Sequence, residues 1–208
     1  MAADRTALLG GQLHWPDWDQ VLSDRTVLGR SGPFFLELFA GEAGISDAVF
    51  AAGVPVLPPV DVVPSARVTT PRDLLDALFW QKILEVITLG LVFFLHCGTP
   101  CNTFTAARKL DGGPPPLRSA DAPLGLPNLS EADRMLVFLG NLFLERTVEA
   151  CYLVFSLGGD FMIENPLLSL LWETELLRQL VRQTRAFALD CDQCAFGTPW
   201  MKPTRFVC

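Results

Sequence analysis

The chain has 208 residues, of which 50% are hydrophobic and only 19% are charged, a composition that excludes a disordered chain and provides for one substantial core. Its formal net charge of −7 argues against a protein that grips nucleic acid through a broad basic surface. The longest apolar run, within 83–97, is interrupted by Glu85, Thr88 and Gly90 and is too short to span a bilayer.

The start of the chain and its cysteines indicate the compartment. The first residues lack the basic start and apolar stretch of a signal peptide. The cysteines do not follow the pattern of a secreted disulfide framework, so we expect an intracellular, reducing compartment, either nuclear or cytoplasmic. Cys191-Asp-Gln-Cys194 is a single CxxC without a second pair of ligands, so we expect no metal.

The pattern of apolar residues predicts an N-terminal extension over 1–32, helical near 18–22, followed by one domain over 33–208. Within the domain we expect alternating strands and helices in this order: strand 34–39, helix 45–52, strand 54–57, helix 72–89, strand 91–97, helix 131–157, strand 160–163, helix 173–184 and strand 186–189. This alternation predicts an α/β fold with a mostly parallel sheet and helices on both faces.

A stretch rich in glycine and proline, 98–129, interrupts the alternation. Its part 105–129 is expected to be a flexible loop of the kind that covers a site. Ser130, with an acid three residues later, is typical of a helix N-cap and predicts where the long helix begins.

Three segments carry chemistry, and the first is the turn Phe39-Ala40-Gly41-Glu42-Ala43-Gly44. It follows a buried strand and precedes a helix, where the helix N-terminus favours negative groups. Asp61 ends the next strand about 20 residues later, at the position where such folds place a carboxylate on ribose hydroxyls. Alternatively, the glycine turn is a tight connection without a ligand, and Asp61 is an ordinary polar loop residue.

The second and third segments follow two other strands. Cys101 lies just after the apolar strand 91–97 and can act as a nucleophile, or it can be a structural cysteine. Glu164-Asn165-Pro166 follows the strand 160–163 and so belongs to the same carboxyl edge. A carboxylate there can hold a proton and hydrogen-bond a ring nitrogen while a thiolate adds to the ring.

Four motifs in this order resemble those of the cytosine carbon-5 DNA methyltransferases. Leu36-Glu37-Leu38-Phe39-Ala40-Gly41-Glu42-Ala43-Gly44 is similar to their DLFAGxGG, and Pro100-Cys101-Asn102-Thr103-Phe104-Thr105 to PCQxFS. Glu164-Asn165-Pro166 is similar to ENV, and Phe196-Gly197-Thr198-Pro199 to the start of YGVPQxRxR. The resemblance extends over about 34–204.

The resemblance implies a Rossmann-like methyltransferase fold with S-adenosylmethionine as cofactor. It implies that the cofactor contacts Phe39, Ala40, Gly41, Gly44, Asp61, Asp73 and Pro100. The catalytic residues would be Cys101, Glu164 and Asn165: the cysteine adds to carbon 6 of a flipped cytosine, and carbon 5 then takes the methyl group. The substrate would be held by Asn102, Thr105, Lys202 and Arg205.

The chain also departs from the family pattern. Asn102 stands for glutamine and Pro166 for valine, and after Pro199 the arginines of QxRxR are missing, so that Lys202 or Arg205 would replace the arginine that holds the base. No target-recognition domain follows. We therefore expect a nucleic acid partner that is single-stranded or presented by a partner protein.

The charge pattern and the departures leave alternatives open. Basic residues cluster locally at 108–109 and 118, at 178–185 and at 202–205. Without methyl transfer, the chain would be a cofactor-binding or interaction module, for example as part of a mobile-element polyprotein. A different enzyme with a small substrate is the third alternative, because a fold does not fix its chemistry.

Overall fold

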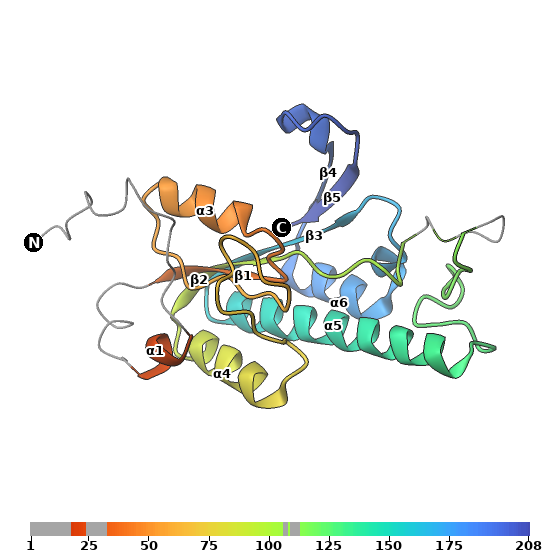
Figure 1. Cartoon of the computed structure of the whole chain (residues 1–208), viewed down its shortest axis with the longest axis horizontal. Helices are drawn as coiled ribbons and strands as arrows, with labels where there is room; N and C mark the ends of the chain where they lie inside the picture. The colour runs from red at the N-terminus through yellow and green to blue at the C-terminus, as the bar shows by residue number, and fades with distance from the viewer. Residues whose placement is uncertain (1–17, 24–32, 106–107, 109–112) are drawn as a thin grey trace, which may run out of the picture. The chain divides into compact units, whose positions relative to one another are not determined.

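The computed structural model describes residues 18–23, 33–105, 108 and 113–208 (Figure 1). The rest of the predicted N-terminal extension, parts of the predicted flexible loop and Lys109 lie outside the described residues. The chain divides into two compact units, Met1–Phe93 and Phe94–Cys208.

The strands confirm the α/β class and show a mixed sheet. Five strands follow the order β1-β2-β3-β5-β4, with bounds β1 Phe34–Leu38, β2 Val92–Cys97, β3 Asp160–Pro166, β4 Ala188–Asp192 and β5 Pro203–Val207. β2 pairs with β3 in parallel, whereas β5 pairs antiparallel with both β3 and β4. The expectation of a mostly parallel sheet therefore holds only for the first strands.

The first unit is built around β1, whose five residues are all buried. The predicted strand 54–57 is reduced to two isolated parallel bridges, from Phe35 to Val56 and from Leu38 to Val60. The prolines at 55, 58 and 59 explain this difference, because they have no N–H to donate to a ladder. The helix α3, Gly44–Ala51, follows β1 and packs against it.

The helix α4 extends over Ala77–Thr88 and so begins five residues later than the sequence pattern predicts. Asp76 is its N-cap and accepts hydrogen bonds from the N–H groups of Leu78 and Phe79. The short helix α1, Trp18–Ser23, confirms the helix predicted near 18–22. Trp18 is buried and meets the Phe79 ring edge-on, with 5.7 Å between the ring centroids.

The second unit is organised by the long helix α5, Glu131–Ser156. The Ser130 hydroxyl accepts a hydrogen bond from the Asp133 N–H, which confirms the predicted cap. α5 packs against β3 and against α6, Glu175–Thr184, and two short 3-10 helices, η2 Leu170–Glu173 and η3 Gln193–Phe196, lie in the connections.

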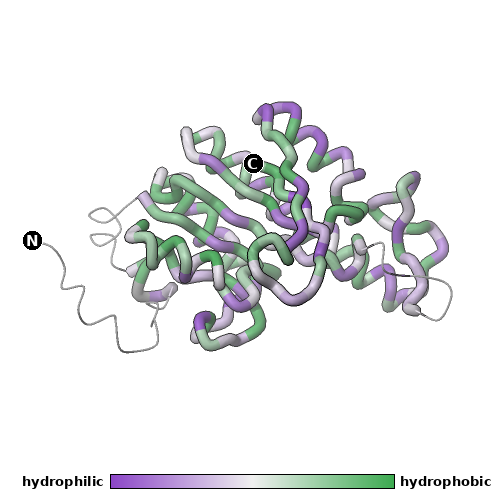
Figure 2. The backbone as a smooth tube through the Cα atoms, turned by 90° about the horizontal axis from the view of Figure 1, so that it is seen from above, coloured by the Kyte–Doolittle hydropathy of each residue, from purple (hydrophilic) through white to green (hydrophobic). Residues whose placement is uncertain are grey.

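Hydrophobic and hydrophilic segments alternate along the whole described chain (Figure 2). Among the helices of the described residues, none combines the length and the apolar character that a membrane crossing needs.

Candidate functional site

The turn that carries Cys101 is fixed by its buried neighbours. Thr99, Thr103 and Phe104 are each at most 3% exposed, and the Thr99 hydroxyl lies 2.9 Å from the Thr147 hydroxyl on α5. Within the turn the Phe104 N–H donates to the Cys101 carbonyl at 2.9 Å. Cys101 itself remains partly exposed. The predicted nucleophile therefore lies at the accessible part of a rigid turn.

The Glu-Asn-Pro segment holds the same turn at two points. The buried Asn165 donates from Nδ2 to the Thr99 carbonyl at 2.6 Å, and the Leu170 N–H donates to the Phe104 carbonyl at 2.9 Å. Because β2 and β3 are parallel and Cys97 is in register with Ile163, both segments leave the sheet at the same edge. The structure thus brings the predicted Cys101 turn and the predicted Glu164-Asn165 motif together.

The side-chain oxygen of Asn165 is a hydrogen-bond acceptor that no described residue satisfies. The residue is 2% exposed, and its Oδ1 has no hydrogen-bond partner among the described residues. Reversing the amide would put this oxygen against the Thr99 carbonyl oxygen, so the assignment of Nδ2 as the donor is physically required. A buried acceptor without a partner costs about 1–3 kcal/mol and favours a donor from a bound molecule.

The Glu164 carboxylate faces two donors. Lys202 Nζ lies 3.1 Å from its Oε1, and Gln193 Nε2 lies 3.5 Å from the same atom. The Glu164 side chain is 20% exposed, so the carboxylate remains accessible from solvent. Of the two cations expected to hold the substrate, Lys202 therefore belongs to the surroundings of Glu164. Gln193 was missed, because it lies outside the four methyltransferase-like motifs.

Arg205, the other cation, points elsewhere. Across β3 and β5 it is in register with Asn165, whereas Glu164 is in register with Phe206. Since neighbouring side chains on a strand point to opposite faces, Arg205 and Glu164 lie on opposite faces of the sheet. Arg205 forms two hydrogen bonds to Asp190, at 2.7 and 2.8 Å, and these hold the pKa of that carboxyl below its usual range.

Arg118 is a buried cation that the sequence pattern did not single out as an anchor. Its guanidinium lies 3.7 Å from the centroid of the Phe104 ring and donates to the Thr103 hydroxyl. It also donates to Asn141 and to the carbonyls of Pro123 and Val137. Burial lowers the pKa of Arg118 to about 10, so it stays protonated at neutral pH. Because these contacts bury it, Arg118 contributes no exposed charge to the local group of basic residues at 108–109 and 118.

The two remaining predicted substrate residues lie on the Cys101 turn. Asn102 is exposed, and its Oδ1 accepts a hydrogen bond from the Thr103 N–H at 2.9 Å. Its carbonyl accepts a hydrogen bond from Arg108 at 3.1 Å. Thr105 is partly exposed at the end of the turn.

The glycine turn in the first unit has an unusual backbone. Phe39, Gly41 and Ala43 all have positive φ, of 56°, 53° and 52°. For Phe39 and Ala43 this conformation costs about 1–2 kcal/mol each. The Gly41 N–H donates to Asp61 Oδ2 at 2.8 Å, and the Val63 N–H donates to Oδ1 at 2.8 Å. The structure thus brings together two of the predicted cofactor residues.

The helix that follows the turn is capped by a residue of β1. Glu37 is buried, and its carboxylate accepts hydrogen bonds from the backbone N–H and the hydroxyl of Ser46. An acid inside an apolar strand was a signal for this role that the sequence interpretation did not use. Ala40 lies next to Gly41 and donates from its N–H to the Val60 carbonyl at 3.0 Å.

Asp73 and Pro100 complete the predicted cofactor contacts. Asp73 is exposed and accepts a hydrogen bond from the Leu75 N–H at 2.8 Å. Its neighbour Arg72 donates from the backbone to the Asp61 carbonyl at 2.8 Å, so the chain returns to the glycine turn near Asp73. Pro100 belongs to the second unit and precedes Cys101.

All six cysteines are free. Burial and the neighbouring Cys97 raise the pKa of Cys151 well above its usual range, which disfavours a reactive thiolate at that buried position. Within the described residues, no group of three or more His, Cys, Asp or Glu side chains is arranged to hold a metal ion.

Comparison with known proteins adds no relative. No protein-family model matches the chain, and no curated protein is significantly similar to it. The four motifs and the geometry around Cys101, Glu164 and Gly41 are therefore the observations that bear on function.

Proposed function

We propose that this chain is an S-adenosylmethionine-dependent methyltransferase with a Rossmann-like fold that methylates carbon 5 of cytosine in single-stranded nucleic acid, or in a strand presented by a partner protein. One observation carries the proposal: the buried hydrogen bond from Asn165 to the Thr99 carbonyl, which ties the Glu164 motif to the Cys101 turn. This contact holds the two segments beside each other at one edge of the sheet, as a shared catalytic site requires.

The chemistry assigns one role to each side chain. The Cys101 thiolate bonds to carbon 6 of the cytosine, and the electron pair of the ring double bond moves towards carbon 5 and the ring nitrogen. Glu164, carrying a proton, donates a hydrogen bond to that nitrogen and so stabilises the negative charge that develops on it. A base then removes the proton from the methylated carbon 5, the double bond forms again, and the thiolate leaves.

The residues of the glycine turn fit the cofactor. S-adenosylmethionine supplies the methyl group when it is bound. Two of the roughly four acceptor positions of the Asp61 carboxylate are taken by backbone N–H groups, which leaves others for ribose hydroxyls. A Cβ atom built on Gly44 would meet nothing within 4 Å, so there is room for a ligand beside the start of α3.

The first test is methyl transfer from labelled cofactor to a pool of single-stranded and duplex nucleic acids. We expect transfer by the wild type, none by Cys101→Ala, and at least a hundredfold less by Glu164→Gln. Cys194→Ala is the matched control, because Cys194 is an exposed thiol on η3 outside the proposed site. Full transfer by Cys101→Ala would overturn the proposed mechanism.

A trapping experiment tests the covalent step itself. An oligonucleotide with 5-fluorocytosine is incubated with the protein and the cofactor. After carbon 5 has taken the methyl group it carries fluorine in place of a proton, so the thiol cannot be eliminated and the adduct persists. We expect a denaturation-resistant complex with the wild type and Cys194→Ala, and no complex with Cys101→Ala. A complex attached at any other cysteine would contradict the assignment.

A second candidate function has a specific observation in its favour. The Glu164 carboxylate is engaged by Lys202, and the only arginine in the altered last motif is held by Asp190 on the other face of the sheet. A module that binds the cofactor without methyl transfer would tolerate both arrangements. Calorimetry separates the two functions: cofactor binding without any nucleic acid binding would favour the module.

A further inference from the structure

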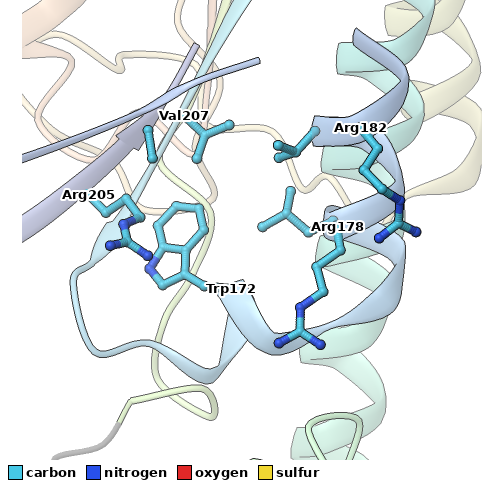
Figure 3. Close-up of a pocket in the computed structure, with 8 residues that line it drawn as sticks. Trp172, Arg178, Arg182, Arg205 and Val207 are labelled. Atoms are coloured by element: carbon cyan, nitrogen blue, oxygen red, sulfur yellow. The ribbon is translucent and has the colours of Figure 1, made fainter. Parts of the chain in front are cut away.

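A pocket of about 280 Å³ lies between α6 and the strand β5 in the second unit. In Figure 3, Trp172 and Arg205 lie on one side of this pocket, and Arg178 and Arg182 project from α6 on the other. The remaining lining is aliphatic and consists of Leu177, Val181, Ala188 and Val207. We call this the arginine pocket. It combines an apolar wall with three guanidinium groups. The guanidinium groups can bind an anionic group, and the apolar wall can contact an aromatic ring of the same ligand.

The three arginines are available to a ligand at small cost. Each forms an ion pair: Arg178 with Glu173, Arg182 with Glu175, and Arg205 with Asp190. The side chains of Arg178 and Arg182 are 49% and 60% exposed, and ion pairs in such surroundings contribute about 0–1 kcal/mol. A phosphate can therefore replace a carboxylate as the partner of each guanidinium.

The arginine pocket is built on the segment that forms the candidate active site. Trp172 donates from Nε1 to the Pro166 carbonyl at 2.8 Å, and Pro166 is the last residue of the Glu-Asn-Pro motif. A neighbouring pocket of about 480 Å³ is lined by 167–170 and shares Trp172 and Arg205 with the first. The two pockets thus extend from Leu167, two residues after Asn165, to α6. Because their shared residue Arg205 lies on the face of the sheet opposite to Glu164, a strand that reaches both sites crosses the carboxyl edge of the sheet.

We infer that the arginine pocket binds a nucleotide of the substrate strand that flanks the cytosine held at Cys101 and Glu164. Phosphate oxygens bind Arg178 and Arg182, which are one helical turn apart on the same face of α6. The base lies against Trp172 and the aliphatic residues, since contact between bases and aromatic side chains tolerates any sequence. This inference rests on the proposed function and names where its substrate strand continues.

A nucleotide fits these observations better than an acidic peptide does. A carboxylate and a phosphodiester each bring one negative charge and two oxygens to a guanidinium, so the arginines alone do not separate the two ligands. A nucleotide adds a flat base that can contact the apolar lining of the pocket, which an acidic peptide side chain does not offer.

Binding is tested with the full-length protein and a fluorescein-labelled single-stranded 12-mer, without cofactor, by fluorescence anisotropy. We expect Arg178→Gln to weaken binding about tenfold and the double variant Arg178→Gln/Arg182→Gln roughly a hundredfold. Arg134→Gln is the matched control, because Arg134 is exposed on α5 and its side chain donates only to the Leu129 carbonyl. Equal affinity of the double variant and the control would overturn the inference, as would competition by polyglutamate that exceeds competition by unlabelled 12-mer.

Methyl transfer separates failure of this inference from failure of the proposed function. The double variant should raise KM for the 12-mer and leave kcat unchanged, whereas free cytidine, which has no flanking nucleotide, should not distinguish the double variant from the wild type. Wild-type transfer with an unchanged KM in the double variant would overturn the arginine pocket alone. Loss of binding in the double variant, in a protein that transfers no methyl group, would support the pocket and contradict the methyltransferase.

Discussion

Arg118 shows how a single charged side chain can position a site without touching the substrate. Its contacts reach Thr103 and Phe104 at one end and Asn141 on α5 at the other. The cation is expensive to bury, as the pKa lowered to about 10 indicates, and its hydrogen bonds offset that cost. The turn that presents Cys101 is therefore fixed to the core by a residue 17 positions away in the sequence.

Replacing Arg118 should destabilise the protein strongly. Arg118→Met keeps an apolar chain but removes the donor to the Thr103 hydroxyl, to Asn141 Oδ1 and to the Pro123 carbonyl. We expect the free energy of unfolding to fall by about 3 kcal/mol. Urea denaturation measures this, with Arg134→Met as the exposed control that should change it by less than about 0.5 kcal/mol. Equal effects of the two substitutions would show that Arg118 is not an anchor.

At the scale of elements, sequence patterns predicted those helices and strands that carry their own signals. β1 is an uninterrupted apolar run, and α5 begins at a serine cap. β5 was missed, because Pro203-Thr-Arg-Phe-Val alternates only weakly and one of its two partners, β3, is distant in the sequence. The link between β4 and β5 is too short for a crossover, so β5 must run antiparallel.

Some residues of the candidate site could be predicted from the sequence, and others could not. Cys101, Glu164 and the Gly41 turn could be predicted, since each follows a strand within a local motif. The partners of Glu164 and Arg205 could not, because which face of β5 each residue occupies follows from the register with β3. Glu37 and Arg118 were missed as anchors because a buried charge reveals itself only through its partners.

The contact between α5 and the Cys101 turn yields a prediction of unusual sign. Alanine for glycine inside a helix normally stabilises by about 1 kcal/mol. At Gly140, however, a Cβ would lie 2.5 Å from the Thr103 hydroxyl and 2.8 Å from Arg118 Nη2. We expect Gly140→Ala to destabilise by about 1–3 kcal/mol and to loosen the turn. Thermal unfolding measures the first effect, and the rate of Cys101 alkylation the second. An increase in melting temperature would contradict the packing described.

Gly44 gives the opposite case in the first unit. It starts α3, and a Cβ there would meet nothing within 4 Å, so Gly44→Ala should leave the stability unchanged or slightly higher. If the space beside α3 belongs to the cofactor, the same substitution should weaken S-adenosylmethionine binding at least tenfold by steric conflict. Calorimetry with the folded variant measures this. Unchanged affinity would place the cofactor away from Gly44.

Over the whole molecule, charge is neutralised locally. The net charge is −7, and within the described residues Arg67, Arg72, Lys82 and Lys202 pair with carboxylates, as do the three arginines of the arginine pocket. Arg118 is buried. A nucleic acid strand would therefore have to displace carboxylates from these cations, and it would depend on base contacts as well as on its backbone.

The salt dependence of the association constant measures how many of these cations a bound strand engages. If a single strand engages only the three arginines of the arginine pocket, the logarithm of its association constant should fall with the logarithm of salt concentration with a slope of about −2. Fluorescence anisotropy titrations at salt concentrations from roughly 50 to 200 mM measure this slope. Replacing Arg178 by glutamine should reduce the slope by about 0.7, whereas Arg134→Gln should not change it. A wild-type slope steeper than about −4 would require a broad basic track, which the paired cations of this surface do not provide.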